Sequence, residues 1–235
     1  RIPLFEQAVG VGDSDRTKRV TFGIRYVDSI LDLFQANLQR YPPLLPQLMN
    51  EPERRLPHLR LHNGTIWRWN RPLVGFDEAG VPHLRIEHRV VPAGPTVSDS
   101  VANAAFYFGC VCALAEQPQA PEQCLPFERA RENFYRAARH GLGARVHWLD
   151  GRCGDMGELC GRLLPLARKG LEQLGIAREE IERWLSIVDG RLASGQNGAA
   201  WQKRWVSRHG ADMQALTEAY LLRQDSGQPV HRWAL

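Results

Sequence analysis

A row of charged residues with alternating spacing is the first feature of this sequence that could do chemistry. Arg85, Glu87 and Arg89 stand at every second position of a run at residues 82–91. Alternate side chains of an extended chain point to the same face, so this spacing would place one carboxylate between two guanidinium groups. The neighbouring positive charges favour the ionised form of the carboxylate near neutral pH. Such a row could bind a metal ion and a phosphate together.

The same alternation also has a plain structural interpretation. Leu84, Ile86 and His88 fill the positions between the charged residues. Half-exposed antiparallel strands alternate in this way, with one apolar and one solvated face. Taken alone, the strand pattern therefore favours an amphipathic strand over a site.

An antiparallel strand pair would position these residues. Two extended runs at 64–71 and 82–91 flank a segment at 74–80 that contains Asp, Glu and two glycines, a composition typical of a turn. In the first run, Arg68 and Asn70 share one face, while two tryptophans share the other. Large aromatic side chains usually fill cores, so Arg68 and Asn70 are the candidates for the site face of this strand.

The order of motifs in this region resembles a known family. The piece GTIWRWNRP is a strand with Trp, polar and Arg residues before a proline, and LRIEHRVVPAGPTVSDSVANAAF continues with a Glu-x-Arg strand and a helix. Together they resemble the type-2 glutamate-cysteine ligases, which are carboxylate-amine ligases of the glutamine synthetase superfamily. The likeness extends more loosely through ARENFYRAARHGLGA and covers residues 26–200.

The resemblance implies an ATP- and Mg²⁺-dependent carboxylate-amine ligase that forms an acyl phosphate and acts on small amino-acid substrates. Glu87 would hold Mg²⁺, and Arg85 and Arg89 would be catalytic because they neutralise charge on the transferred phosphoryl group. The family usually has an acidic residue in the preceding strand, where this chain has Arg68 and Asn70. That departure removes a potential metal ligand, and it supports the alternative of a ligase-like interaction or regulatory domain that has lost the reaction.

Five residues are candidates for substrate binding. Arg68 and Asn70 lie in the first strand, and Asn133, Arg136 and Arg139 lie in a predicted helix at 127–140. The resemblance indicates the three helical residues. Arginines on helices are more often solvated or paired, so a structural role stays open for them.

The rest of the chain is predicted to be largely helical. Apolar residues at three- and four-residue spacing predict a helix at 28–40, and Thr96 or Ser98 can begin another that ends at residue 116. Small residues in that second helix would allow close packing against the sheet. The later predicted elements are helices at 127–140, 156–174, 179–192, 199–209 and 212–223, with short strands at 20–25 and 144–148.

These elements predict an α+β fold, with a small antiparallel sheet covered by helices and a mostly helical C-terminal half. The resemblance makes it part of a glutamine synthetase-like catalytic fold. We predict a single domain over 1–235, with a connecting segment at 1–19, the sheet and its helices at 20–116 and a helical region at 127–235. The chain begins with Arg and a linker-like segment, so we expect a C-terminal fragment of a larger ligase-like protein. Half a catalytic sheet would expose an unpaired edge, and we therefore expect a homodimer.

Composition sets limits on other classes of function. The formal charge is +4 and the pI is about 9.0, but the sequence has no lysine-rich run, so we do not expect nucleic-acid binding. We expect no membrane partner, because no apolar run approaches the roughly 18 residues of a membrane span. Five cysteines without a CxxC pair indicate reduced thiols in a cytoplasmic protein. The GxSxG, P-loop, GxGxxG and HExxH motifs are also missing from the sequence.

Overall fold

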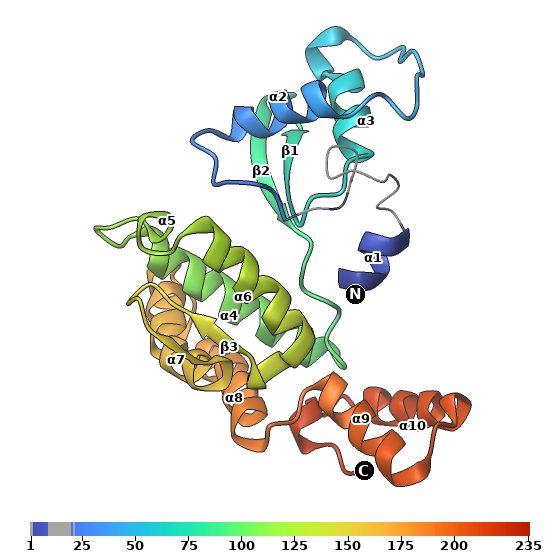
Figure 1. Cartoon of the computed structure of the whole chain (residues 1–235), viewed down its shortest axis with the longest axis vertical. Helices are drawn as coiled ribbons and strands as arrows, with labels where there is room; N and C mark the ends of the chain where they lie inside the picture. The colour runs from blue at the N-terminus through green and yellow to red at the C-terminus, as the bar shows by residue number, and fades with distance from the viewer. Residues whose placement is uncertain (1, 9–19, 21) are drawn as a thin grey trace. The chain divides into compact units, whose positions relative to one another are not determined.

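The computed structural model describes residues 2–8, 20 and 22–235. They form two compact units, with the boundary between Pro92 and Ala93 (Figure 1). The predicted α+β class is confirmed, because helices predominate and two small antiparallel sheets are present among the described residues.

The first unit holds one strand pair and its helices. Its elements are α1 (Ile2–Ala8), α2 (Ile30–Arg40), the 3-10 helix η1 (Glu53–Arg55), α3 (Pro57–Gly64), β1 (Asn70–Phe76) and β2 (Pro82–His88). The helix α2 confirms the prediction at 28–40. Ser29 caps it by accepting a hydrogen bond from the backbone N–H of Leu31 at 3.2 Å. Both α2 and α3 pack against β1 (Figure 1).

Two expectations concern the start of the chain. The segment Ile2–Ala8 of the expected connecting segment is a helix, and residues 9–19 of it lie outside the described part of the chain. The strand expected at 20–25 is not formed by Val20 or by residues 22–25, which are bends and irregular backbone. Gly23 has a φ of 103°, and this interrupts the extended conformation that a strand needs.

The first strand begins later than predicted. Residues 57–64 form α3, with Pro57 at its start where a missing N–H has no cost, and β1 begins only at Asn70. The turn is tighter than expected, because Asp77 accepts a hydrogen bond from the backbone N–H of Val81 through Oδ1 at 2.7 Å and Gly80 adopts a φ of 81°. This turn sets the register in which Asn70 pairs with His88.

The second unit is a helical assembly with a second strand pair. Its elements are α4 (Val97–Ala115), α5 (Pro121–Cys124), α6 (Phe127–His140), η2 (Gly141–Gly143), β3 (Arg145–His147), β4 (Cys153–Asp155), α7 (Met156–Gln173), α8 (Arg178–Ser194), α9 (Gly198–His209), α10 (Met213–Asp225) and η3 (Val230–Arg232). All six helices predicted after residue 95 are therefore present, and none of their ends is shifted by more than two residues. The strand predicted at 144–148 is β3, and its partner β4 was not predicted.

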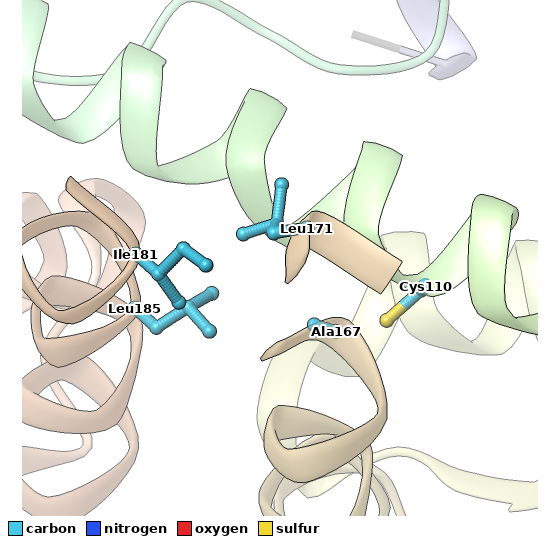
Figure 2. Packing of buried hydrophobic residues seen from close by; sticks show 5 residues of the cluster. All are labelled: Cys110, Ala167, Leu171, Ile181 and Leu185. Atoms are coloured by element: carbon cyan, nitrogen blue, oxygen red, sulfur yellow. The ribbon is translucent and has the colours of Figure 1, made fainter. Parts of the chain in front are cut away.

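The helix α4 packs against α7 and α8 (Figure 1). Of its small residues, Ala102 packs on α8 and Gly109 lies against Ala167 of α7, where the sequence predicted packing against the sheet. A buried cluster joins the three helices, and Figure 2 shows its members: Cys110, Ala167, Leu171, Ile181 and Leu185. Burial raises the pKa of the Cys110 thiol to about 12, so this cysteine is a protonated core residue.

Two glycines let α4 and α7 approach closely. A Cβ at Gly109 would collide with the backbone carbonyl of Ala167, and a Cβ at Gly170 would collide with the backbone carbonyl of Gly109. The crossing of the two helices therefore has no room for a larger residue at either position.

A buried ion pair lies at the N-terminal end of α4. Thr96 caps the helix by accepting a hydrogen bond from the backbone N–H of Asp99 at 3.1 Å, and Asp99 is fully buried. Its Oδ1 lies 3.3 Å from Nε of Arg191 in α8, while its Oδ2 accepts a hydrogen bond from the backbone N–H of Val230 at 3.0 Å. Arg191 also donates to Asn103 at 2.6 Å. One carboxylate thus connects α4, α8 and the C-terminal segment.

By length and composition, α4 could cross a membrane. Its mean hydropathy over 18 residues is 1.3, and 22% of that window is buried in the structure. Core helices of water-soluble proteins meet the same criteria, and α4 packs on α7 and α8. The expectation of no membrane partner stays a prediction.

The close crossing of α4 and α7 gives a test of the fold. We expect Gly170→Ala to lower the free energy of unfolding by about 1–3 kcal/mol, because the added methyl group overpacks the crossing. Gly161→Ala is the control in the same helix, where a Cβ meets no atom within 4 Å. It should stabilise by up to about 1 kcal/mol through helix propensity. Urea unfolding measures both, and equal effects of the two substitutions would contradict the packing.

Candidate functional site

The candidate site is a cluster of one carboxylate and two guanidinium groups on the β1–β2 pair. Oε2 of Glu87 accepts hydrogen bonds from Nε of Arg71 and from Nη1 of Arg89, each at 2.8 Å. Nη2 of Arg71 lies 2.7 Å from the same oxygen. We call these three residues the charge cluster.

The strand register assembles the charge cluster. Arg71 lies directly opposite Glu87, so both side chains point to the same face of the pair. Arg89 follows two residues after Glu87 and is on that face too, because its backbone N–H donates to the carbonyl of Trp69 at 2.9 Å and extends the ladder.

Each arginine is held by a second contact. Nη1 of Arg71 donates to the carbonyl of Gly64, at the end of α3, at 3.1 Å. The guanidinium of Arg89 lies over the ring of Trp67, 4.1 Å from its centroid, in a cation–π arrangement. The Trp67 ring in turn contacts Phe5 of α1, with ring centroids 4.2 Å apart. These contacts limit the rotation of both guanidinium groups.

The charge cluster carries a net positive charge and is open on one side. The side chains of Arg71 and Arg89 are 15% and 16% exposed, whereas that of Glu87 is 37% exposed. Burial raises the pKa of the Glu87 carboxyl, but the hydrogen bonds and charges of Arg89 and Arg71 outweigh it and leave the pKa below its usual value. With Glu87 ionised, two cations and one anion leave a charge of +1, which attracts an anion.

Sequence reasoning did not identify Arg71 as a site residue, and Arg85, which it did identify, does not join the charge cluster. The prediction took the face of Arg68 and Asn70 for the site face of the first strand, so it left Arg71 out. Arg85 is exposed and lies opposite Leu73, and within the described chain Glu87 bonds to Arg71 and Arg89 instead. The signal that could have found Arg71 is the Asp77–Gly80 turn, which implies the pairing of Arg71 with Glu87.

Arg68 lies in a buried polar network rather than on the site face. Its side chain donates to Oδ1 of Asn37 through Nε at 3.0 Å and Nη2 at 2.8 Å. Asn37 donates to Asn63 at 3.0 Å, and Asn63 donates to the carbonyl of Pro72 in β1 at 2.7 Å. Burial lowers the pKa of the Arg68 guanidinium. This network connects α2, α3 and β1.

Asn70 lies on the opposite face from Glu87. It pairs with His88 across the strands, and its Oδ1 is 2.8 Å from Nδ1 of His88. Burial lowers the pKa of the His88 imidazole. The expectation that Asn70 and Arg68 lie on the site face is therefore wrong. The face that carries Glu87 is the one with Arg71, and Arg89 on that face lies over Trp67. The roles of Asn70 and Arg68 in substrate binding stay predictions.

The three helical candidates lie in α6, in the second unit. Asn133 donates to the carbonyl of His147 at 2.6 Å and accepts from its backbone N–H at 2.9 Å, so it fastens α6 to β3. Arg136 donates to the carbonyl of Arg145 at 3.4 Å, and Arg139 is exposed. Asn133 thus has a structural function, while substrate binding by these residues stays a prediction.

Two cavities lie in the first unit. One, of about 380 Å³, includes Arg71 in its wall and lies between α2, α3 and β1. The other, of about 790 Å³, is lined by the leucines and prolines of residues 38–48 and by α3. The smaller cavity is the one that includes a member of the charge cluster.

Comparison with known families decides the relationship. The family model "Glutamate-cysteine ligase family 2 (GCS2)" matches residues 17–220. The chain belongs to glutamate-cysteine ligase family 2. The family implies a carboxylate-amine ligase kind of function, generally ATP-dependent, which confirms the resemblance seen in the sequence. No curated protein and no solved structure matches the chain.

Few side chains near the charge cluster could bind a magnesium ion. Among the residues that the structure describes, no group of three His, Cys, Asp or Glu side chains could hold a metal ion. Glu87 is a single carboxylate ligand, and both arginines bond to its Oε2. Mg²⁺ in nucleotide sites is often bound by one or two carboxylates together with phosphates and water. These residues alone do not form a complete Mg²⁺ site.

The lowered pKa of Glu87 predicts a pH-dependent contribution to stability. A carboxyl with a depressed folded pKa stabilises the protein above its ordinary pKa of 4.5, and this contribution is lost as the pH falls through the folded pKa. We expect Glu87→Gln to lower the free energy of unfolding by about 1 kcal/mol near pH 7. The loss is small because Glu87 is partly exposed, and near pH 2 the substitution should not change the free energy of unfolding. Thermal unfolding across pH measures this.

The control for this experiment is Glu78→Gln in the exposed turn between the strands. It should change stability by less than about 0.5 kcal/mol at every pH, since surface substitutions have small effects. A Glu87→Gln defect that grew toward acid pH would contradict the ion pairs of the charge cluster.

Proposed function

We propose that this chain carries the phosphoryl-transfer site of an ATP-dependent carboxylate-amine ligase. In this reaction a substrate carboxylate attacks the γ-phosphorus of ATP, which forms an acyl phosphate and releases ADP. An amine then attacks the acyl carbon, forms the amide bond and releases inorganic phosphate. The substrates would be small amino acids.

The observation that carries the proposal is the charge cluster on the β1–β2 pair. Phosphoryl transfer needs positioning and electrostatic stabilisation more than it needs a nucleophilic side chain. Arg71 and Arg89 are fixed by Gly64 and Trp67, and guanidinium groups suit phosphate oxygens in geometry and charge. Pre-organised cations of this kind lower the energy of developing negative charge without reorganising during the reaction.

Glu87 has two roles in this proposal. It holds Arg71 and Arg89 side by side, which two like charges would otherwise resist. The bonds from both arginines end on Oε2, so within the described residues Oε1 stays available as one oxygen ligand for Mg²⁺. Bound there, Mg²⁺ would neutralise charge on the nucleotide phosphates.

Removing the charge of Glu87 tests the proposal directly. We expect Glu87→Gln and Arg89→Ala each to lower amino-acid-dependent ATP turnover by at least about a hundredfold, which corresponds to about 3 kcal/mol of transition-state stabilisation. Arg71→Ala should behave like Arg89→Ala, because both bond to the same oxygen. The measurement is ADP release with mixtures of amino acids, at temperatures where each variant is folded.

The control is Arg54→Ala, an exposed arginine of η1 outside the charge cluster, which should keep turnover within about threefold. Equal ATP turnover in the unmodified protein and the charge-cluster variants would show that these residues do not act in phosphoryl transfer. If the unmodified protein neither binds Mg-ATP nor turns it over, the interaction or regulatory domain takes the place of the ligase.

We also propose that the chain forms a homodimer. Leu84 and Ile86 of β2 are 47% and 51% exposed on the face opposite Glu87, and each strand of the described two-stranded sheet has an unpaired edge. Light scattering should give a molar mass twice that of the chain, and Ile86→Lys should lower this mass toward that of the monomer. A monomer at high concentration would contradict this. The cytoplasmic location and the absence of nucleic-acid partners stay predictions.

A further inference from the structure

A pocket of about 330 Å³ lies in the second unit, between α10 and the segment that follows this helix. We call it the C-terminal pocket. Arg223 of α10 and Arg232 of η3 line it, together with Ser226 and Gln228. Its wall therefore offers two positive charges and further hydrogen-bond donors, and none of the described residues that line it is Asp or Glu.

The protein does not neutralise the two guanidinium groups of this pocket. In the described part of the chain, the side chains of Arg223 and Arg232 form no ion pair and donate no hydrogen bond to the protein. Other arginines of the same unit differ, since Arg191 is paired with Asp99. Two like charges that line one pocket repel each other, and an anion bound between them removes this repulsion.

The backbone that carries Arg232 is held by buried side chains. Trp233 is 5% exposed, and its indole N–H donates to the carbonyl of Gln228 at 2.6 Å. The buried Gln196 donates to the carbonyls of Val230 and Trp233, at 2.7 and 2.9 Å. Arg232 lies between these two carbonyls in the sequence, so its backbone is in place before a ligand binds. This pre-organisation reduces the entropy that binding costs.

The remaining wall of the C-terminal pocket is apolar and is formed by Ala219, Leu222 and Trp233. The volume is near the lower end of the roughly 300–1,000 Å³ that small-molecule sites occupy, which leaves room for a compact organic group beside an anion. Guanidinium groups match phosphate oxygens in geometry and charge. A phosphate monoester carries a charge of about −1.5 to −2 at pH 7, and this balances two arginines.

We propose that the C-terminal pocket binds a small phosphate monoester with a compact apolar organic group. Arg223 and Arg232 hold the phosphate, and the organic group lies against Leu222. All but one of the lining residues lie at 222–233, after the region 17–220 that matches the family, so membership of the family assigns no role to them. The site contains no residue of the charge cluster and does not rest on the proposed function.

The experiment measures binding by calorimetry, with phenyl phosphate as the probe and without nucleotide or Mg²⁺. Phenyl phosphate should bind saturably, and at least about tenfold more tightly than inorganic phosphate, which lacks the apolar group, or phenol, which lacks the charge. The charge cluster also attracts anions, so the titration is repeated with the Arg89→Ala protein. This variant should keep the same affinity for phenyl phosphate at the C-terminal pocket.

Matched variants assign the binding to its residues. Arg223→Gln and Arg232→Gln should each weaken phenyl phosphate binding by at least about tenfold, because each removes a charged donor to the phosphate. The control is Arg208→Gln, an exposed arginine of α9 in the same unit that does not line the pocket, and it should change the affinity by less than about twofold. Thermal unfolding of all three variants should match that of the unmodified protein.

Three results would overturn the C-terminal pocket as a phosphate site. One is the lack of saturable phenyl phosphate binding, or phenol binding of equal affinity. Another is binding that both Arg223→Gln and Arg232→Gln leave unchanged, including binding that only Arg89→Ala removes. The third is equal weakening by Arg208→Gln, which would indicate a general attraction of anions to a basic protein.

The outcomes also separate this inference from the proposed function. Phenyl phosphate binding with the expected preferences, in a protein that shows no ATP turnover, supports the C-terminal pocket and overturns the ligase. ATP turnover that depends on Glu87, together with a failure to bind phenyl phosphate, keeps the ligase and overturns the C-terminal pocket.

Discussion

The cross-strand pairing of Arg71 with Glu87 is the constraint on which the candidate site depends. It brings a second guanidinium to the oxygen that already accepts a bond from Arg89, and it connects the cluster to the end of α3 and to the smaller cavity. A shift of one residue in the register would send Arg71 to the other face and leave Arg89 and Glu87 as an isolated pair. The Asp77–Gly80 turn protects against this, because it sets which residues pair.

Within each unit, a buried polar network holds the elements together. In the first unit, Arg68, Asn37 and Asn63 join two helices to β1 at Pro72. In the second unit, Asp99 joins α4, α8 and the C-terminal segment. Buried polar groups are costly when they lack partners, so such networks select one arrangement of their elements over others. Arg68 therefore acts on the site through the position of β1, and not through a contact with Glu87.

The helices were the most predictable part of the molecule. Those at 28–40 and after residue 95 form close to the predicted residues, because apolar periodicity and capping residues such as Ser29 and Thr96 act within a few positions along the chain. The strands were harder to place. The first strand was predicted from residue 64 but begins only at Asn70, and residues 57–64 form α3, which contacts β1.

The sequence by itself determined the family, the α+β class, most helices and the two residues Glu87 and Arg89, because these depend on local periodicity and on motifs in order. The tertiary structure decided what lies across from them. Arg71 joined the charge cluster and Arg85 stayed outside it because strand pairing is a non-local choice, in which one turn determines the partner of every residue. The same holds for Arg68 and for α4: their partners Asn37 and Gly170 are distant in the sequence, and only packing brings them together.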